Sequence, residues 1–372
     1  MAEPVRILVV GQTPPPYGGQ AVMIQRMLEG TYPGFELIHV RMGFSREMSE
    51  IGHFRPGKVL ELVGLLLRTF RAWLRYRPPI LYYPPGGPKL VPFLRDIVFL
   101  PLVRPWFKVT LFHFHASGVA DLYPKLNWLL KRLFWLAYRH PELAIRSAET
   151  SPDDGGFMKA KRSLVLPLGL PDQARGKLQR NDRNGPPVIL YVGVVMRTKG
   201  VQVLLEACAR LKDLGGQFRL VAVGQFESPE FEREVRDFVE AKGLSPLVSF
   251  PGILVGADKW RAYEEADIFC FPSFFEAESF PLVLIEAMMF GLPIVTTRWR
   301  GIPGLVRDGD NGFLVEPQNP AETAEKLAKL CDQRVLREQL GSRGRERFVA
   351  EFSQAVFERR MGAAFALASS MI

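Results

Sequence analysis

Residues 188–200, VILYVGVVMRTKG, hold the pattern that decides the fold of this chain. The run Val188–Gly193 is apolar, and a helical pattern over 200–214 follows the glycine-bounded turn. A short, continuous apolar run is typical of a strand that is buried on both faces of a parallel sheet. The stretch therefore predicts one strand–turn–helix unit of an α/β protein.

The same alternation extends over the 372 residues, with a break at the polar stretch 171–187, whose composition is that of a linker. We therefore predict an α/β protein of two Rossmann-like, doubly wound domains, 1–172 and 173–352, facing each other across a cleft. We expect a C-terminal helix at about 353–372 to pack back on the first domain. Predicted strands are 6–10, 36–40, 80–83, 109–114, 143–146, 164–168, 188–193, 219–224, 248–251, 268–272, 294–297 and 312–315, and predicted helices are 20–29, 58–76, 91–102, 125–139, 200–214, 229–242, 282–290 and most of 320–366.

The net charge of +9 is unevenly distributed. Residues 1–172 hold 22 Lys+Arg and 13 Asp+Glu, whereas residues 173–372 hold 26 of each. Within 55–146 there are 15 basic and 4 acidic residues. This distribution predicts one basic face rather than a uniformly basic protein that binds nucleic acid. The three cysteines lack CxxC spacing, which disfavours both a disulfide framework and a structural zinc site.

Two sequence features bear on localisation. The apolar run 7–10 is too short for the core of a signal peptide, and the longest apolar segments are broken by charged residues or proline. The sequence contains no run of about 18 apolar residues, so it predicts no membrane-spanning helix. We expect a cytoplasmic protein, with the inner membrane face as a possible place of attachment.

The loop after the first strand, GQTPPPYGGQ at 11–20, is the first candidate for an anion site. Gly18 and Gly19 stand at the start of a predicted helix, where free backbone N–H groups favour a phosphate. The sequence is not a dinucleotide fingerprint, because it does not follow GxGxxG. The alternative is a tight turn that binds nothing.

The turn after Gly193 carries two cations, Arg197 and Lys199. A guanidinium fork and a point charge at the carboxyl end of a strand are suited to a diphosphate. The alternative is a solvated basic turn.

The segment 271–288, FPSFFEAESFPLVLIEAM, follows a buried strand and opens an apolar helix. Pro281 suits the first helical turn, so the amides of Phe280 and Leu282 are expected to point at an anion. Glu286 lies within an apolar helix and needs a partner, because an unpaired buried carboxylate is costly. A pair of sugar hydroxyls would satisfy Glu286, and the alternative is an ion pair with a nearby arginine.

Glu278 and Glu286 are separated by seven residues, and the context PSFFEAESFPLVLIEAMMFGLPIVTT resembles the EX7E motif of retaining glycosyltransferases of family 4, which have the GT-B fold. The loop ending at Gly18-Gly19, the turn 192–200 and the stretch NGFLVEP at 311–317 are similar to further motifs of that family. The resemblance is specific over 188–317 and looser over 1–172. The chain departs from the family at Val194, where many members have arginine, and at Leu168, where many have asparagine.

The resemblance implies transfer of a hexose from a UDP- or GDP-sugar with retention of configuration. In this mechanism neither a metal nor a cofactor is needed, and the nucleotide-sugar is a substrate. Asp308-Gly-Asp310 imitates a metal-binding motif but has the composition of a turn. The implied catalytic residues are Glu278, His115, Arg197 and Lys199, and the donor-binding residues are Gly18, Gly19, Gly193, Ser279, Phe280, Pro281, Leu282 and Glu286.

His113 and His115 lie on one face at the end of a predicted strand. The resemblance assigns a sugar contact to a histidine at this place, and His115 fits best. A structural role suits His113 better. A metal site is disfavoured because no carboxylate lies near in sequence. Closure of the two domains is expected to bring the His115 side against the donor.

The basic first half indicates what the acceptor is. Arg68, Arg71 and Arg75 fall on one helical face, and large aromatics accompany the cations of 131–139. Such segments suit an anionic membrane, which favours a glycan or lipid-linked acceptor in polysaccharide or glycolipid synthesis. The alternative is a buried apolar helix with a solvated basic rim. One alternative function is a nucleotide-sugar epimerase on the same fold, but the sequence does not offer the set of cleft carboxylates and histidines that such an enzyme usually needs. Another is a basic nucleic-acid-binding protein, but no recognised nucleic-acid motif is present.

Overall fold

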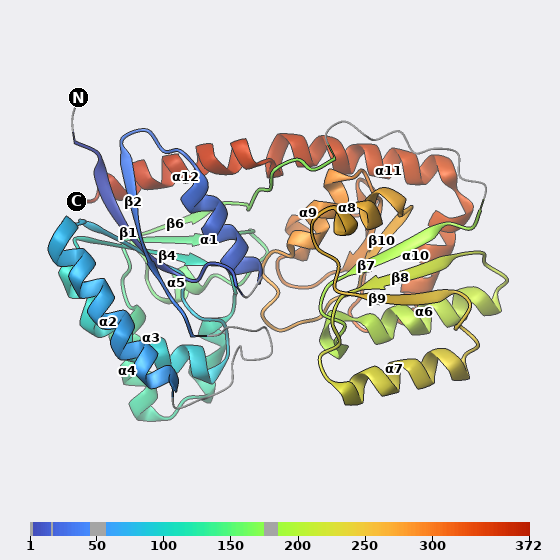
Figure 1. Ribbon diagram of the computed structural model, residues 1–372, viewed down its shortest axis with the longest axis horizontal. Coiled ribbons are helices and arrows are strands. Elements are labelled where there is room, and N and C mark those ends of the chain that lie inside the picture. Colours follow the sequence, from blue (N-terminus) through green and yellow to red (C-terminus); the bar gives the residue numbers. More distant parts are fainter. Residues whose placement is uncertain (1–2, 16–17, 45–56, 175–184) are drawn as a thin grey trace. The chain divides into compact units, whose positions relative to one another are not determined.

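The computed structural model describes residues 3–15, 18–44, 57–174 and 185–372. The chain forms two compact units, Met1–Leu168 with Ala355–Ile372 and Gly169–Gln354 (Figure 1). The division after Leu168 falls four residues before the expected boundary. Most of the predicted linker, 175–184, lies outside the described residues.

The first unit is built on a parallel sheet with the order β2-β1-β3-β4-β5-β6. The strand order reverses at β1, so the glycine loop that follows β1 lies at a topological switch point, where doubly wound sheets bind ligands. The predicted sixth strand is shifted, since β6 covers 162–165 and not 164–168. The strands are β1 (Val5–Gly11), β2 (Phe35–Arg41), β3 (Ile80–Tyr83), β4 (Val109–Phe114), β5 (Leu143–Arg146) and β6 (Arg162–Val165).

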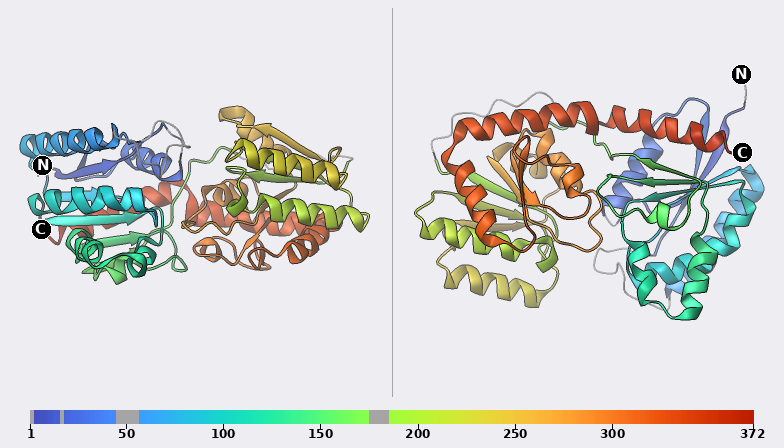
Figure 2. Two further views of the ribbon diagram at one scale, coloured as in Figure 1. Left: turned by 90° about the horizontal axis from the view of Figure 1, so that it is seen from below. Right: turned by 180° about the vertical axis from the view of Figure 1, so that it is seen from behind.

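Three helices cover one face of this sheet: α2 (Gly57–Tyr76), α3 (Leu90–Val103) and α4 (Trp128–Tyr138). The last helix, α12 (Gln354–Ser369), belongs to the first unit and lies alongside it, as Figure 2 shows. Phe365 of α12 packs edge-on against Tyr32, with ring centroids 5.0 Å apart. The last helix is thus held in the first unit by an aromatic contact.

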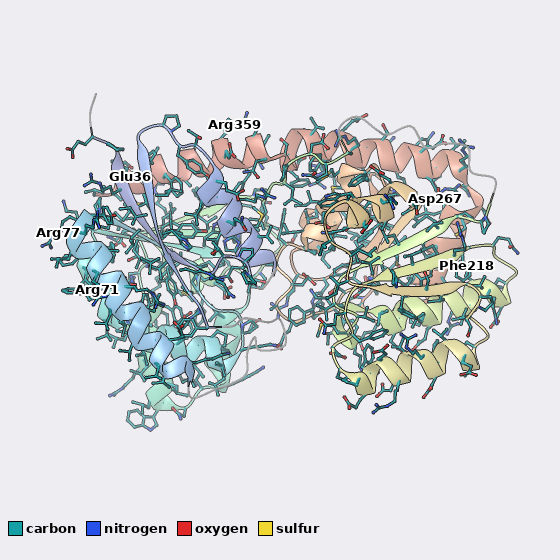
Figure 3. The ribbon with its side chains drawn as sticks, viewed as in Figure 1. Glu36, Arg71, Arg77, Phe218, Asp267 and Arg359 are labelled. Atoms are coloured by element: carbon teal, nitrogen blue, oxygen red, sulfur yellow. The ribbon has the colours of Figure 1, made fainter. Side chains whose placement is uncertain are left out.

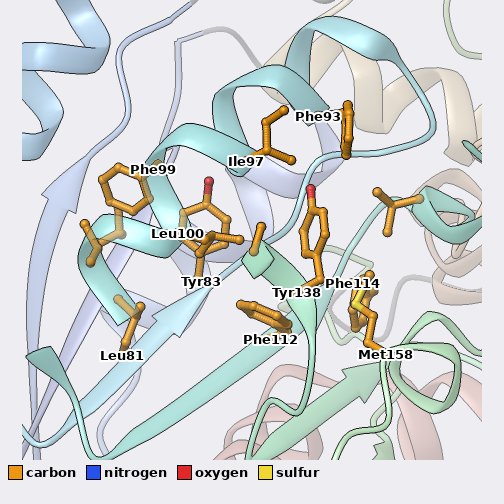
Figure 4. Packing of buried hydrophobic residues seen from close by; sticks show 14 of the residues in the cluster. Leu81, Tyr83, Phe93, Ile97, Phe99, Leu100, Phe112, Phe114, Tyr138 and Met158 are labelled. Carbon is orange, nitrogen blue, oxygen red and sulfur yellow. The ribbon is translucent and has the colours of Figure 1, made fainter. Parts of the chain in front are cut away.

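The core between the sheet and α2–α4 is rich in aromatic side chains (Figure 4). It also contains the fully buried carboxylate of Asp96. Asp96 accepts hydrogen bonds from the hydroxyls of Tyr83 (2.6 Å) and Tyr138 (2.9 Å), and Arg95 pairs with it at 2.7 Å. Burying this charge is tolerable because it is paired and fully hydrogen-bonded.

The second unit has a parallel sheet with the order β12-β11-β10-β7-β8-β9. Right-handed crossovers place α6 and α7 on one face and α8 and α9 on the other, as Figure 1 shows. The strands are β7 (Val188–Val192), β8 (Arg219–Val223), β9 (Val248–Gly252), β10 (Ile268–Phe271), β11 (Ile294–Thr297) and β12 (Gly312–Val315), and the helices are α6 (Val201–Asp213), α7 (Pro229–Ala241), α8 (Gly256–Glu265), α9 (Leu282–Met289), α10 (Pro320–Asp332) and α11 (Arg334–Arg347).

The strands and helices of the second unit follow the predicted pattern within one or two residues, with the exception of α8. The sequence of α8, GADKWRAYEE, is mostly polar, and its pattern predicts no helix. Strands β7 and β10 are parallel neighbours in this sheet. The turns that follow them therefore lie at the same edge of the sheet.

Candidate active site

The loop after β10 and the turn after β7 meet at the carboxyl edge of the second sheet. Lys199 ends a short 3₁₀ turn, Arg197–Lys199, and Gly200 follows with φ +83°. A side chain at Gly200 would place Cβ 2.0 Å from the carbonyl oxygen of Pro272, so the glycine is needed for the approach of the two segments. The amide of Phe274 donates to the carbonyl of Thr198 at 2.8 Å and joins them.

Glu278 and Lys199 are brought together by this arrangement. The Nζ of Lys199 lies 2.5 Å from Oε2 of Glu278, and the two side chains are only 18% and 8% exposed. Ser273 Oγ donates to the same carboxylate oxygen at 2.8 Å. The Lys199 ammonium also lies over the ring of Phe275, 4.6 Å from its centroid. The result is a nearly buried, charge-neutral cluster.

The strands beside this cluster fix its walls. Thr297 Oγ1 donates to the carbonyl of Ser273 at 2.5 Å, and Trp299 Nε1 donates to the carbonyl of Phe275 at 2.8 Å. Both tie the loop after β10 to the segment around the end of β11. Tyr191 is buried beside the carboxylate of Glu278, and burial together with that charge raises the pKa of its phenol well above the ordinary value. Sequence reasoning did not single out Ser273 or Tyr191, although both lie within the quoted stretches 271–288 and 188–200.

Arg197 lies apart from the cluster. Its guanidinium is 55% exposed, pairs with Glu234 of α7 and lies over the ring of Phe231. Gly193, at the start of the turn, has φ +157°, and a Cβ there would lie 3.3 Å from the ring of Phe271. The turn therefore presents one cation to the Glu278 loop and the other to α7.

Glu286 is buried in α9, as its apolar context predicts, but its partners differ from those expected. Lys259 Nζ lies 2.5 Å from Oε1, and Tyr263 OH donates to Oε2 at 2.7 Å. Burial and the carboxylate of Glu286 raise the pKa of Tyr263. Helix α8 therefore supplies partners for this carboxylate, and its cation is a lysine rather than the arginine considered as the alternative. The contact of Glu286 with sugar hydroxyls stays a prediction. The spacing of Lys259 and Tyr263, i and i+4, was the signal that could have revealed a shared partner.

The N-terminus of α9 lies directly after this loop. Pro281 is the N-cap rather than the first helical residue, with φ −67° and ψ +111°, and Leu282 begins the helix. The first amides of a helix have no partner within the helix, so this end is suited to an anion. Ser279 and Phe280 are buried just before it, and Phe280 packs against Phe352 with ring centroids 5.9 Å apart.

In the first unit, Gly18 is the N-cap of α1 (Gly19–Glu29). No side chain caps this end with a hydrogen bond, and the first turn of the helix holds no acidic residue. Both properties suit an anion site. Residues 16–17 of the glycine loop lie outside the described residues.

His113 and His115 share one partner in the first unit. The hydroxyl of Tyr82 lies 2.8 Å from Nδ1 of His113 and 3.1 Å from Nε2 of His115, and the two imidazole centroids are 4.1 Å apart. The remaining ring nitrogens, Nε2 of His113 and Nδ1 of His115, are buried and have no hydrogen-bond partner among the described residues. Burial lowers the pKa of His115 to about 3 and that of His113 well below its usual value. Both imidazoles are therefore neutral at physiological pH.

Within the described residues, no group of three or more His, Cys, Asp or Glu side chains could hold a metal ion. Asp308 accepts from Arg298 at 2.6 Å and from the amide of Leu314, which accounts for its place in the turn. Burial raises the pKa of the Cys331 thiol to about 12, and the Cys208 and Cys270 thiols are buried as well.

Residues 173–347, almost the whole of the second unit, match the family described as glycosyl transferases group 1. The second unit is a group 1 glycosyl transferase domain. The fold of the whole chain agrees with a solved structure, sucrose-phosphate synthase from Thermosynechococcus elongatus. The two superimpose with a TM-score of 0.74 at 20% identity, and the match covers 99% of this chain and 100% of that one. The chain has the two-domain GT-B fold, as the resemblance implied.

Curated relatives match between about half and two thirds of the chain. A putative colanic acid biosynthesis glycosyltransferase of Salmonella typhimurium is 33% identical over 183 residues, which are 47% of this chain and 44% of that protein. Phosphatidyl-myo-inositol mannosyltransferase of Mycobacterium leprae is 28% identical over 250 residues, 67% of this chain and 57% of that protein. The matches thus span about half the length of these relatives.

Proposed function

We propose that this protein is a retaining hexosyltransferase that moves a sugar from a UDP- or GDP-sugar to a glycan or lipid-linked glycan. The observation that carries the proposal is the Lys199–Glu278–Ser273 cluster at the carboxyl edge of the sheet, beside the N-terminus of α9. The match of this unit to group 1 glycosyl transferases supports it. The names of two relatives, which refer to colanic acid and to phosphatidyl-myo-inositol, support a role in polysaccharide or glycolipid synthesis.

The leaving diphosphate is the part of the donor that Lys199 and the α9 amides would hold. Negative charge develops on it as the glycosidic bond breaks, and fixed positive groups stabilise that charge. Lys199 is now paired with Glu278, so a bound diphosphate would share the ammonium with the carboxylate. Glu278 would then be placed to accept hydrogen bonds from sugar hydroxyls. Arg197 can contribute only by leaving Glu234, which its exposure permits.

Glu286 is proposed to hold the ribose of the donor. A carboxylate has about four lone-pair sites, and Lys259 and Tyr263 occupy one on each oxygen. The remaining sites could accept hydrogen bonds from two ribose hydroxyls, with Lys259 balancing the charge. This assignment now depends on the unused sites and not on an unpaired carboxylate.

His115 is proposed to contact the transferred sugar as a neutral imidazole. Its buried Nδ1 has no partner within the described residues, and its Nε2 is engaged by Tyr82. A neutral ring can donate or accept one hydrogen bond at Nδ1, according to its tautomer. Acid catalysis by a histidinium is not part of the proposal, because its pKa is too low.

No metal ion, cofactor or side-chain base is required in this scheme. The acceptor hydroxyl would attack from the face that the diphosphate leaves and would pass its proton to a phosphate oxygen, which accounts for retention. The donor-binding set otherwise comprises Gly18, Gly19, Gly193, Ser279, Phe280, Pro281 and Leu282. We propose a cytoplasmic location, with the basic region 55–146 at an anionic inner membrane face.

A thermal-shift screen against UDP, GDP and their common sugars tests the donor assignment. The true donor is expected to raise Tm, because it binds the folded state alone. Glu286→Ala should abolish this rise and lower turnover by more than about tenfold. Glu230→Gln, on the exposed side of α7, is the matched control and should change neither. Unchanged turnover of Glu286→Ala within about threefold would refute the ribose assignment.

A further inference from the structure

The outer face of α3 is apolar along its whole length. Four of its residues are exposed, and all four are aliphatic, with exposed fractions between 39% and 52%. They recur every fourth residue and form one ridge. The opposite side of α3, including Phe93, Ile97 and Leu100, is buried in the core. A helix that is apolar all round is normally enclosed on every side. The ridge residues are Leu90, Leu94, Val98 and Leu102.

The neighbouring helix α2 carries a second ridge of the same kind. At 100° per residue, five exposed apolar side chains fall within an arc of about 80°. Arginines occupy the adjoining arc of about 60°, so the polar edge of the ridge is cationic. Figure 3 shows Arg71 on this outer side of α2. The apolar residues are Leu60, Val63, Leu67, Phe70 and Leu74, and the arginines are Arg68, Arg71 and Arg75.

The third helix, α4, extends the same surface. Trp128 is 69% exposed, the largest exposed fraction of an aromatic residue among the described ones, and Leu129 and Leu136 are half exposed. Arg132 lies between them, over the Trp128 ring. An indole at the edge of an apolar surface is typical of proteins that lie in a membrane interface.

The three ridges form one continuous surface, because α2 packs on α3 and α3 on α4 in a single layer (Figures 1 and 2). The described parts of these helices hold two acidic residues. The Glu61 side chain is 42% exposed but pairs with Arg68, and Asp96 is buried. We define this surface, the outer side of α2, α3 and α4, as the helical face.

We infer that the helical face inserts into the headgroup–acyl boundary of an anionic bilayer. Apolar ridges with cationic edges and an exposed tryptophan match the layered chemistry of that boundary, in which hydrocarbon lies beneath anionic headgroups. A second copy of the chain is the weaker match, because a symmetric pair would set the arginines of one face against those of the other. The described residues include no helix that is both long and apolar enough to cross a membrane. Attachment through the helical face would therefore be in the plane of the membrane surface.

Vesicle sedimentation with purified full chain tests the inference. Phosphatidylglycerol–phosphatidylcholine vesicles should bind the protein, and phosphatidylcholine vesicles should bind it much more weakly. The pair Leu94→Gln with Val98→Gln should lower partition at least about tenfold without a change in charge. The pair Arg71→Gln with Arg75→Gln should lower it about fivefold per arginine. The control pair, Leu214→Gln with Val335→Gln, replaces apolar residues of the second unit that are even more exposed and should leave binding unchanged.

Insertion has its own signal. Vesicles with brominated acyl chains should quench part of the tryptophan fluorescence, and Trp128→Phe should remove that part. Three results overturn the inference: no binding to anionic vesicles, equal binding by the Leu94/Val98 pair, or a dimer in solution that this pair abolishes. Donor-dependent stabilisation is measured without lipid. A lack of vesicle binding would therefore not contradict the proposed sugar transfer, and a lack of sugar transfer would not contradict vesicle binding.

Discussion

Helices α3 and α7 each cover one face of a parallel sheet, but their outer sides differ. Both bury apolar residues at intervals of three or four, such as Phe231 and Val235 in α7. The outward residues of α7 are mainly charged, among them Arg233, Glu234 and Arg236, whereas those of α3 are all aliphatic. The residues on the inner side of a helix are thus determined by packing on the sheet. The residues on its outer side indicate what surrounds the helix.

The two units also differ in where their distinctive groups lie. The second unit places its polar groups in pairs at the carboxyl edge of its sheet, where Lys199–Glu278 and Lys259–Glu286 lie. The first unit places an apolar, cationic surface on its outside. Donor chemistry and membrane attachment should therefore respond to different substitutions.

The largest expected effect is on turnover. Glu278→Gln keeps the shape of the side chain but removes the charge that faces Lys199, and kcat/KM should fall by about 10²- to 10³-fold. Vesicle binding should not change, because the substitution lies in the second unit. Kinetics with the donor found by thermal shift, together with vesicle sedimentation, measure both. A parallel loss of vesicle binding would break the separation of the two units.

Removing one partner of the second buried pair should mainly reduce stability. Lys259→Met leaves the Glu286 carboxylate, 9% exposed, with only Tyr263, and the free energy of unfolding should fall by about 2–3 kcal/mol. The reduction is smaller than for a fully enclosed pair because Lys259 is 23% exposed. Denaturant unfolding measures it. The double variant Lys259→Met with Glu286→Gln should recover part of the loss, and no recovery would mean that the charge of Glu286 is not the cause.

Much of the fold was predictable because buried strands leave local signals. The runs at 188–192 and 294–297 are apolar and bounded by turns, and the structure places β7 and β11 there. Helix α8 was missed because Tyr263 is its one fully buried residue, which leaves almost no apolar periodicity. The partners of Glu286 were missed for the same reason, since they lie 23 and 27 residues away on that helix.

The sequence indicated which residues form the candidate site, but not which partner each side chain contacts. The two cations of the turn after β7 look equivalent in sequence, yet Lys199 faces Glu278 and Arg197 faces Glu234. The difference depends on which neighbouring element each side chain meets, and that follows from tertiary packing. The same holds for Tyr82, whose position between two histidines depends on the register of β3 against β4.

Matched valines test the contrast between α7 and α3 directly. Val235 is fully buried, and Val235→Ala should lower the free energy of unfolding by about 2 kcal/mol, since a methyl-lined cavity remains. Val98 is 46% exposed, and Val98→Ala should change it by less than about 0.5 kcal/mol. Denaturant unfolding without lipid compares the two. An equal loss for both would show that the outer ridge of α3 is covered in the free protein.

A further expected effect is a pH dependence that the histidines confine to the first unit. All five histidines of the sequence precede residue 141, so the second unit, 169–354, contains none. The folded-state pKa values of His113 and His115 lie below the unfolded value of about 6.5, so the unfolded chain binds more protons between the two values. Stability conferred by these neutral rings is thus complete above pH 6.5 and is lost as the pH falls toward 3.

Between pH 6.5 and 5, before most carboxylates titrate, each buried histidine should lower the unfolding free energy by up to about 1.4 kcal/mol per pH unit. Amide protection factors, which remove the intrinsic slowing of exchange at lower pH, should therefore fall in β3 and β4 and not in β7 or β10. His115→Gln should flatten this dependence by removing one of the titrating rings. An equal fall in both sheets would assign the loss to groups other than the histidines, because the second sheet has none to titrate.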